Sequence, residues 1–308
     1  MLSFKSSYFF WQPKNQKIYH HLYQKPFLLL IWNLYWVLNL SSLSPLYPEF
    51  GFMASEKRFG YEWSKYRELN PLYENQFKQW LGPVSPDFIM GKRILDAGCG
   101  MGRNSYWCLK WGAEHVTAFD NDERTVEAAV ETLAEFPNTT IEKQSIYSIP
   151  YKNEFDIVFS VGVVQLLENP ADAVEQLIGA LKPGGTLVLW LYAHEGNGFV
   201  LKVIDPIRRF FTSKLPPRVL DCFTYLLSAP LYTYIRIFRP KSEYYQTLRQ
   251  FPFRNIHLII FDHLLPTVAW YFTKEEALDL ISELQDKTAD YINNNSWTVT
   301  GIKTTSDS

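Results

Sequence analysis

The sequence is poor in cysteine and nearly balanced in charge. Its three cysteines, Cys99, Cys108 and Cys222, form no C-x-x-C pair in a chain of 308 residues. This odd, unpaired set argues against a disulfide framework, predicts no metal site and indicates a reducing compartment. The formal net charge of -2 does not point to a nucleic-acid binder. The length fits one large α/β domain with an appendage, or two small domains.

The N-terminal region lacks a clear membrane span. Its apolar run, residues 27–40, is interrupted by Asn33 and Asn39, whereas a spanning helix needs about twenty apolar residues. No small-x-small cleavage site follows it. Residues 1–52 are therefore a membrane anchor, a helix that packs on the domain, or translated sequence upstream of a true start at Met53. We expect a cytoplasmic protein, with membrane association left open.

A glycine-rich segment after an apolar strand is the most informative feature. Asp96 precedes three glycines at alternate positions, Gly98, Gly100 and Gly102. Glycines let backbone amides approach a ligand because no Cβ stands in the way. A second apolar run ends at Asp120, whose carboxylate can accept both hydroxyl protons of a ribose. The pattern predicts a nucleoside cofactor.

Two cofactor classes use this geometry. In a dinucleotide fingerprint the third glycine comes three positions after the second, and a helix N-terminus faces a pyrophosphate. Here the third glycine, Gly102, comes only two positions after the second, Gly100. In addition, Asp96 would repel a pyrophosphate but attract the α-ammonium and sulfonium groups of a methionine-derived cofactor. Both features favour the methionine-derived cofactor.

Two further landmarks follow in order along the chain. Residues 155–164 form an apolar, strand-like run, and residues 181–189 contain a Lys-Pro-Gly-Gly turn before another strand. With the glycine segment, they resemble the class I S-adenosylmethionine-dependent methyltransferases, in the small-molecule branch, over roughly residues 59–303. Each landmark alone is an ordinary connection; their order and spacing carry the resemblance. It implies S-adenosyl-L-methionine as the cofactor.

Alternating strand and helix patterns predict an α/β fold. We expect a Rossmann-like, seven-stranded, mostly parallel sheet with the last strand antiparallel, helices on both faces, and a helical basic and aromatic insert between strands five and six. The expected parts are an N-terminal extension (1–52), a leading helical lid (53–90), the S-adenosylmethionine-binding core (91–195), a helical insert or substrate cap (196–272), and a C-terminal helix and strand pair (273–308).

The resemblance also assigns the residues that would bind the cofactor. Asp96 and the three glycines would face its methionine part, Asp120 the ribose and Asn121 the adenine. A serine and an isoleucine stand where the family often has an acidic residue and a small apolar one, so the usual contact with the adenine amine is in doubt. The full predicted set is Asp96, Gly98, Gly100, Gly102, Asp120, Asn121, Ser145, Ile146 and Val161.

Methyl transfer needs mainly close, collinear placement of nucleophile and methyl group. A general base is needed only when the acceptor must lose a proton. Residues 165–166, Gln-Leu, stand where many family members carry two histidines, which removes that source of a base. The remaining candidates are His194, at the end of the fifth strand, and His263. Asp262 could orient His263 only if the backbone turns between them.

Residues 199–254 are strongly basic. They carry ten Lys or Arg and three acids, a charge of +7, which leaves -9 for the rest. Such a cap, with Tyr61 and Trp63 as lid candidates, would select an anionic acceptor, either a small molecule or a lipid- or glycan-linked one, with peripheral membrane contact. Alternatively, the arginines are simply solvated. Nucleic acid is not expected as a partner, because no recognition motif accompanies the charge.

The predicted function is therefore an S-adenosylmethionine-dependent methyltransferase that acts by in-line displacement on such an acceptor. Two alternatives remain open at this point. A nicotinamide-dependent oxidoreductase would bind a dinucleotide in the same crevice. A catalytically inactive partner subunit would bind S-adenosyl-L-methionine without transferring its methyl group.

Overall fold

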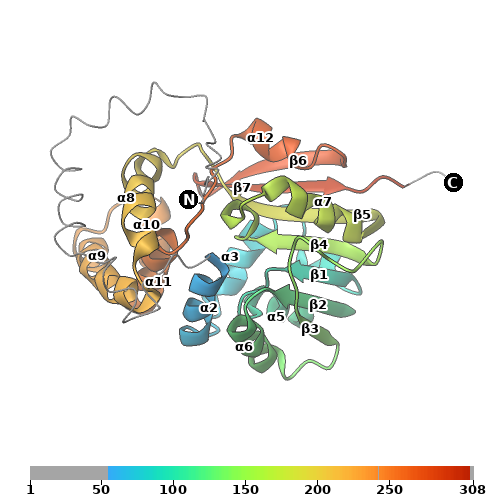
Figure 1. Cartoon of the computed structure of the whole chain (residues 1–308), viewed down its shortest axis with the longest axis horizontal. Helices are drawn as coiled ribbons and strands as arrows, with labels where there is room; N and C mark the ends of the chain where they lie inside the picture. Colours follow the sequence, from blue (N-terminus) through green and yellow to red (C-terminus); the bar gives the residue numbers. More distant parts are fainter. Residues whose placement is uncertain (1–54, 242, 306–308) are drawn as a thin grey trace, which may run out of the picture. The chain divides into compact units, whose positions relative to one another are not determined.

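The computed structural model describes residues 55–241 and 243–305, and a seven-stranded sheet lies at its centre (Figure 1). The strands are β1 (Arg93–Ala97), β2 (His115–Asp120), β3 (Thr139–Lys143), β4 (Phe155–Val161), β5 (Leu181–Tyr192), β6 (Gln285–Ile292) and β7 (Ser296–Ile302). Their spatial order is β3-β2-β1-β4-β5-β7-β6. Neighbours from β3 to β5 are parallel, and β7 is antiparallel to both β5 and β6. This confirms the predicted fold.

Both faces of the sheet are apolar and covered by helices. Ile94 and Leu95 are fully buried but belong to different cores, because consecutive side chains of a strand point to opposite faces. The core of Leu95 is covered by α7 (Pro170–Ala180) and α12 (Lys274–Asp279), and that of Ile94 by α3 (Leu72–Trp80), α4 (Pro86–Ile89), α5 (Arg103–Lys110) and α6 (Glu123–Leu133). Continuous apolar runs were the expected signature of strands covered in this way.

The chain reverses its order in the sheet between β1 and β4. In open α/β sheets, ligands bind beyond the carboxyl ends of the strands at such a point. The carboxyl ends of β1, β2 and β4 are Ala97, Asp120 and Val161. Because these strands are adjacent and parallel, the loops that follow them meet at one edge.

Between β5 and β6 the chain leaves the sheet and forms a helical insert. Its elements are η4 (Val200–Ile204), α8 (Asp205–Phe210), η5 (Thr212–Lys214), α9 (Pro217–Phe238), α10 (Glu243–Leu248) and α11 (Phe253–Leu264). In Figure 1 these helices gather on one side of the sheet, and α2 (Ser55–Lys65) runs next to them and contacts both α6 and α9. In the two described ranges, no helix combines the length and apolarity needed to cross a bilayer.

The C-terminal elements differ in extent from their predicted bounds. The pattern predicts a helix over 274–284 and a strand over 289–292, but α12 ends at Asp279 and β6 begins at Gln285. The side chains of β6 are mostly exposed at the edge of the sheet, so no apolar alternation marks its beginning. Asp286 also takes a φ of 48°, where the register with β7 shifts. The predictions for residues 1–52 lie outside the described residues.

Candidate active site

A cavity of about 390 Å³ opens at the carboxyl ends of the central strands. The loops after β1, β2 and β4 form one part of its lining, with Gly98 and Asp120 among the residues. Another part of the lining comes from helices and includes Trp63 of α2 and Asp262 of α11. The cavity therefore has a sheet-derived half and a helix-derived half.

The glycine segment is shaped by backbone conformation and close packing. Gly98, Gly100 and Gly102 all have positive φ, of 77°, 55° and 82°, which L side chains rarely adopt. A Cβ on Gly98 would lie 2.5 Å from a methyl carbon of Val163, and one on Gly100 would lie 3.2 Å from the Trp63 ring. Glycine is thus required at Gly98 by its φ and by its neighbour. Of the three glycines, Gly98 and Gly100 line the cavity.

Asp120 lies at the end of β2, where the sequence places the ribose-binding carboxylate. Its Oδ2 accepts a hydrogen bond from the Gly100 amide at 3.1 Å, and its Oδ1 accepts one from the Asp122 amide at 3.2 Å. Burial raises the pKa of Asp120 to about 6, against the opposing effect of these amides. Each carboxylate oxygen has a further lone pair for a ligand hydroxyl. The carboxylate can therefore tie the glycine segment to a ribose.

Asp96 has a different environment from the one expected. It is 1 % exposed, and its Oδ2 accepts a hydrogen bond from Ser105 Oγ at 2.6 Å. Burial raises its pKa to about 7, with the Ser105 hydrogen bond acting in the opposite direction. Asp96 lies outside the cavity lining. In this structure it anchors α5 beneath the glycine segment, and its contact with the methionine part of a cofactor stays a prediction.

The residues predicted at the adenine end lie together. Asn121, Ser145, Ile146 and Val161 all line the cavity beside Asp120. The Ser145 hydroxyl accepts a hydrogen bond from the Tyr147 amide at 3.3 Å, so part of its capacity is used within its own turn. Four residues from three separate loops or strand ends thus converge on one side of the cavity.

The cavity is rich in aromatic rings, which come from the helices and also from β2 and β5, and the sequence pattern singled out few of them. Trp63 was the one lid candidate that lines the cavity, whereas Tyr61 hydrogen-bonds to Asp221 instead. The aromatic residues of the lining are Phe59, Trp63, Tyr73, Trp80, Phe119, Tyr147, Trp190, Tyr192 and Phe251. The only sequence signal for them was a general richness in aromatic residues on either side of the cofactor segment.

The two predicted base candidates occupy unlike positions. His263 lines the cavity, stacks on Tyr192 with ring centroids 6.2 Å apart, and its Nδ1 lies 2.9 Å from the Ile259 carbonyl oxygen. If Nδ1 donates that hydrogen bond, Nε2 is left as an acceptor. The Ile259 carbonyl, rather than Asp262, therefore orients the ring. His194 is exposed and lies outside the lining.

Sequence comparison shows which protein family the sheet-derived half of the site matches. Residues 95–189 match the family described as "Methyltransferase domain". Together with the seven-stranded sheet and its antiparallel last strand, this confirms the prediction of a class I S-adenosylmethionine-dependent methyltransferase domain with S-adenosyl-L-methionine as its cofactor.

Curated relatives match the same region. A tRNA U34 carboxymethyltransferase of Methylococcus capsulatus is 34% identical over 123 residues, which are 38% of this chain and 36% of the relative. The enzyme of the same name from Vibrio cholerae is 32% identical over 130 residues, 41% of this chain and 39% of the relative. The chain thus matches well under half the length of these relatives.

Solved structures give a weaker likeness. Magnesium protoporphyrin IX methyltransferase from Synechocystis, solved with bound SAH, is 15% identical, with a TM-score of 0.47, and the match covers 76% of this chain and 84% of that one. The structure of N-methyltransferase NodS from Bradyrhizobium japonicum is 13% identical, with a TM-score of 0.45 and coverage of 77% and 98%.

The comparisons correct one prediction. Nucleic acid was not expected as a partner. The acceptor was expected to be a small or a lipid- or glycan-linked molecule, with membrane association left open. The relatives named for tRNA contradict this expectation. The negative charge outside residues 199–254 argued against a nucleic-acid partner. Nucleic-acid binding depends, however, on local positive charge, and the +7 segment supplies such charge without a recognisable motif.

Proposed function

We propose that this protein transfers an alkyl group, in the first instance methyl, from S-adenosyl-L-methionine to an acceptor held in the helix-derived half of the cavity. The observation that carries the proposal is the convergence of the glycine segment, Asp120 and Asn121 on one cavity whose other half is aromatic. Such an arrangement can hold donor and nucleophile close and in line, which can lower a barrier by up to roughly 7 to 11 kcal/mol.

We infer that the acceptor is a base of tRNA. The names of the curated relatives support this choice. The chain contributes two features that fit it. Rings such as Trp63, Trp190 and Tyr192 line the cavity, and aromatic rings stack on bases that leave their helix. The segment 199–254 carries a charge of +7, which favours contact with phosphates.

Cofactor binding is the first test. Purified protein is titrated with S-adenosyl-L-methionine and with its demethylated product, and thermal unfolding is followed. At a ligand concentration 100 times the Kd, binding adds about 2.7 kcal/mol to the free energy of unfolding. We expect a clear upward shift with both compounds and none with NADH. A shift with NADH alone would support the oxidoreductase alternative and overturn the proposal.

Transfer is the second test. Protein is incubated with tritium-methyl S-adenosyl-L-methionine and either total tRNA or a small-metabolite extract. We expect label in tRNA, and mass spectrometry of the nucleosides then identifies the methylated base. Label in the metabolite fraction alone would overturn the RNA assignment. Binding of the cofactor without transfer to either fraction would favour an inactive partner subunit.

His263 stays a candidate base within this proposal. Its ring lines the cavity and presents one nitrogen without an assigned hydrogen bond. His194 stays a prediction as well, and its exposed position outside the lining gives it no contact with an acceptor in the cavity. His194→Ala should therefore keep the wild-type turnover number, and His263→Ala tests whether this ring takes the acceptor proton.

A further inference from the structure

We propose that Asp262, backed by the buried Glu62, binds the reacting group of the acceptor and takes its proton during transfer. The inference rests on the proposed function, because it assigns residues to the acceptor end of the same cavity. From the sequence, Asp262 is expected only as a partner of His263, and Glu62 is not singled out at all. The two residues are brought together from α2 and α11, which lie far apart in the chain.

Position and burial set this pair apart from other acids of the chain. Asp262 lines the cavity, and Glu62 is 0% exposed and interacts with it. Both Glu62 oxygens and Asp262 Oδ1 are buried without a hydrogen bond from any described N–H or O–H group. A hydrogen bond can form between the two carboxyl groups only when one of them is protonated. The remaining oxygens face no donor from the described protein.

Packing alone does not account for such a pair. Burying a carboxyl group without donors costs several kcal/mol, and apolar side chains of similar size would avoid that cost. The nearby guanidinium of Arg103 lies 4.0 Å from the ring centroid of Tyr73, and no ion pair joins it to either carboxylate within the described ranges. Asp262 is half-buried and lines the cavity, so its carboxyl group is available to a ligand that brings its own N–H or O–H.

The surroundings of the pair favour a state in which the two carboxyl groups share one proton. Burial raises the pKa of Glu62 well above its usual range, and the neighbouring Asp262 charge adds to the effect. Burial raises the pKa of Asp262 too. Two adjacent carboxyl groups cannot both ionise easily, so one stays protonated. The other charged or titratable groups that act on the pair or respond to it are Arg103 (α5), His263 (α11), Asp221 (α9), Tyr73 (α3) and Tyr192 (β5).

This charge state suits proton removal. The acceptor N–H or O–H donates to the ionised carboxylate while its nucleophilic atom attacks the methyl carbon. The bond from nucleophile to carbon forms as the carbon–sulfur bond breaks, and that electron pair returns the sulfonium to a neutral thioether. The acceptor proton moves to Asp262, so the pair becomes neutral. The proton is then released to solvent as the product leaves.

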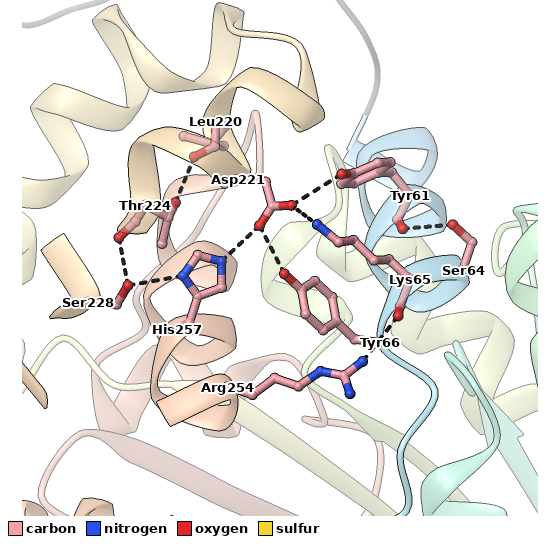
Figure 2. A network of polar contacts seen from close by, with 10 residues as sticks. All are labelled: Tyr61, Ser64, Lys65, Tyr66, Leu220, Asp221, Thr224, Ser228, Arg254 and His257. Atoms are coloured by element: carbon pink, nitrogen blue, oxygen red, sulfur yellow. Dashed lines mark hydrogen bonds and ion pairs between the residues drawn. The ribbon is translucent and has the colours of Figure 1, made fainter. Parts of the chain in front are cut away.

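A second network holds the two helices of the pair in place (Figure 2). Asp221 accepts hydrogen bonds from Tyr66 Oη at 2.9 Å and from His257 Nε2 at 2.8 Å, and it also pairs with Lys65. Lys65 is the last residue of α2 and Tyr66 follows it, a short way after Glu62, and His257 lies on α11 before Asp262. Asp221 thus positions both carboxyl groups from behind without lining the cavity itself.

The same network has the composition of a hydrolytic triad but not its accessibility. Ser228 Oγ lies 3.0 Å from His257 Nδ1, and it also donates to the Thr224 carbonyl at 2.8 Å. Ser228 is 0% and His257 is 1% exposed. A buried serine cannot reach a substrate, so these residues position the helices and do not attack an acyl group.

The decisive experiment compares Asp262→Asn, Glu62→Gln and the exposed control Asp279→Asn. Turnover is measured with tritium-methyl S-adenosyl-L-methionine and whichever fraction, total tRNA or metabolite extract, wild type labels. We expect Asp262→Asn to lower kcat by roughly 10² to 10⁴ with cofactor affinity unchanged, which is the usual contribution of a general base. The control should keep wild-type turnover.

The pH profile separates a proton acceptor from a structural residue. Glu62→Gln replaces the protonated partner by an uncharged group that can still donate to Asp262, so the acid limb of kcat should remain. Asp262→Asn should abolish that limb. If instead Asp262→Asn keeps kcat and its acid limb while His263→Ala abolishes both, the pair is overturned as the base and the proposed function survives. Failure of wild type to bind S-adenosyl-L-methionine would overturn both.

Stability gives a readout that does not depend on an acceptor. Because both pKa values are raised in the folded protein, wild type loses stability as pH rises from the usual carboxyl range through the raised values. Glu62→Gln and Asp262→Asn remove this loss. We expect their melting temperatures to exceed that of wild type by a margin that grows with pH. A margin that is independent of pH would show that the pair does not share a proton and would overturn the inference.

Discussion

The two halves of the cavity are built in different ways. The sheet-derived half comes from one stretch of chain, and its hydrogen bond between the Gly100 amide and Asp120 spans 20 residues. The helix-derived half joins distant segments, and the bond between Tyr66 and Asp221 spans 155 residues. The cofactor end therefore follows local backbone rules, whereas the acceptor end depends on tertiary packing.

The two halves also differ in what holds them. Around the glycine segment, close packing fixes the structure, because Gly98 has no room for a Cβ beside Val163. Around the helix-derived half, buried polar groups fix the structure. Asp221 is at the centre of one cluster of such groups, and Glu62 belongs to another. A substitution in the first half should disturb cofactor binding, and one in the second should disturb stability or turnover with less effect on cofactor affinity.

Asp221→Ala should have the largest effect on stability. It leaves His257 and Tyr66 buried without their shared acceptor, and breaking a buried pair in this way costs about 3 to 5 kcal/mol. Urea unfolding measures the loss, and cofactor titration should show a much smaller change. Asp279→Ala, an exposed acid on α12, serves as the control. A loss below about 1 kcal/mol, the range of exposed pairs, would contradict the importance of the network.

The effect of Asp221→Ala should also depend on pH. Burial alone would raise the pKa of Asp221, but hydrogen bonds from Lys65, His257 and Tyr66 together lower it. A lowered carboxyl pKa stabilises the folded state above the unfolded pKa, which is about 3.9 for aspartate, and this contribution disappears as pH falls further. The difference between wild type and variant should therefore narrow in acid.

Gly98→Ala should come next, with its effect on the cofactor half. Gly98 and Gly91 have similar φ, 77° and 71°, but a Cβ on Gly91 would meet nothing within 4 Å. Gly91→Ala should therefore cost only the strain of positive φ, about 1 kcal/mol. Gly98→Ala adds overpacking against Val163 of about 1 to 3 kcal/mol. Cofactor affinity should fall for Gly98→Ala alone, as measured by calorimetry.

A double variant tests the cause. If the contact with Val163 is responsible, Val163→Ala in the Gly98→Ala background should restore part of the stability and the cofactor affinity. No recovery would mean that the backbone strain at Gly98 accounts for the whole effect, and that close packing does not distinguish this half of the cavity.

This contrast also explains what the sequence could predict. The strands β1 to β4 could be predicted because apolar periodicity is a local signal. Asp120, Asn121, Ser145, Ile146 and Val161 line the cavity, and their contact with a cofactor stays a prediction. The placement of Asp96 was not predicted, because its bond to Ser105 depends on how α5 docks. A local pattern fixes which loop a residue is on, not which way its side chain points.

The helix-derived half could not be predicted in the same way. Glu62 is an ordinary acid between two aromatic residues in the sequence, and only the docking of α11 places Asp262 against it. Asp262 does not orient His263, because α11 continues through both residues and their side chains diverge. The His263 ring instead hydrogen-bonds to the Ile259 carbonyl, four residues earlier. Non-local pairing leaves no periodic trace in one sequence.

Asp120→Asn should affect binding and stability in opposite directions. Loss of charged hydrogen bonds to ribose hydroxyls, about 1.5 to 3 kcal/mol, should weaken cofactor binding by roughly tenfold to a hundredfold. Wild-type affinity should also fall below about pH 6, where the carboxyl group takes up a proton, whereas the variant should be insensitive to pH. Calorimetry between about pH 5 and 8, a range that includes this pKa, measures the cofactor affinity of each protein and its dependence on pH.

Unfolding of the cofactor-free protein completes this test. The pKa of Asp120 is raised in the folded state, so the stability that it contributes is lost as pH rises through about 6. Asp120→Asn should thus be more stable than wild type at neutral pH while it binds the cofactor less tightly. A variant that is less stable and binds normally would show that Asp120 serves the fold and not the ligand.

Glu131→Gln should have the smallest effect and sharpens the comparison most directly. The end of α2 is held on two sides. Arg67, two residues after the helix, pairs with Glu131 of the cofactor half, and their side chains are 35% and 64% exposed. Lys65, the last residue of the helix, pairs with the 3% exposed Asp221 of the insert. Water screens the first pair, which should contribute less than about 0.5 kcal/mol. Urea unfolding at low and high salt measures it. A loss comparable to that of Asp221→Ala would mean that α2 is held equally by both halves, and that burial is not what distinguishes them.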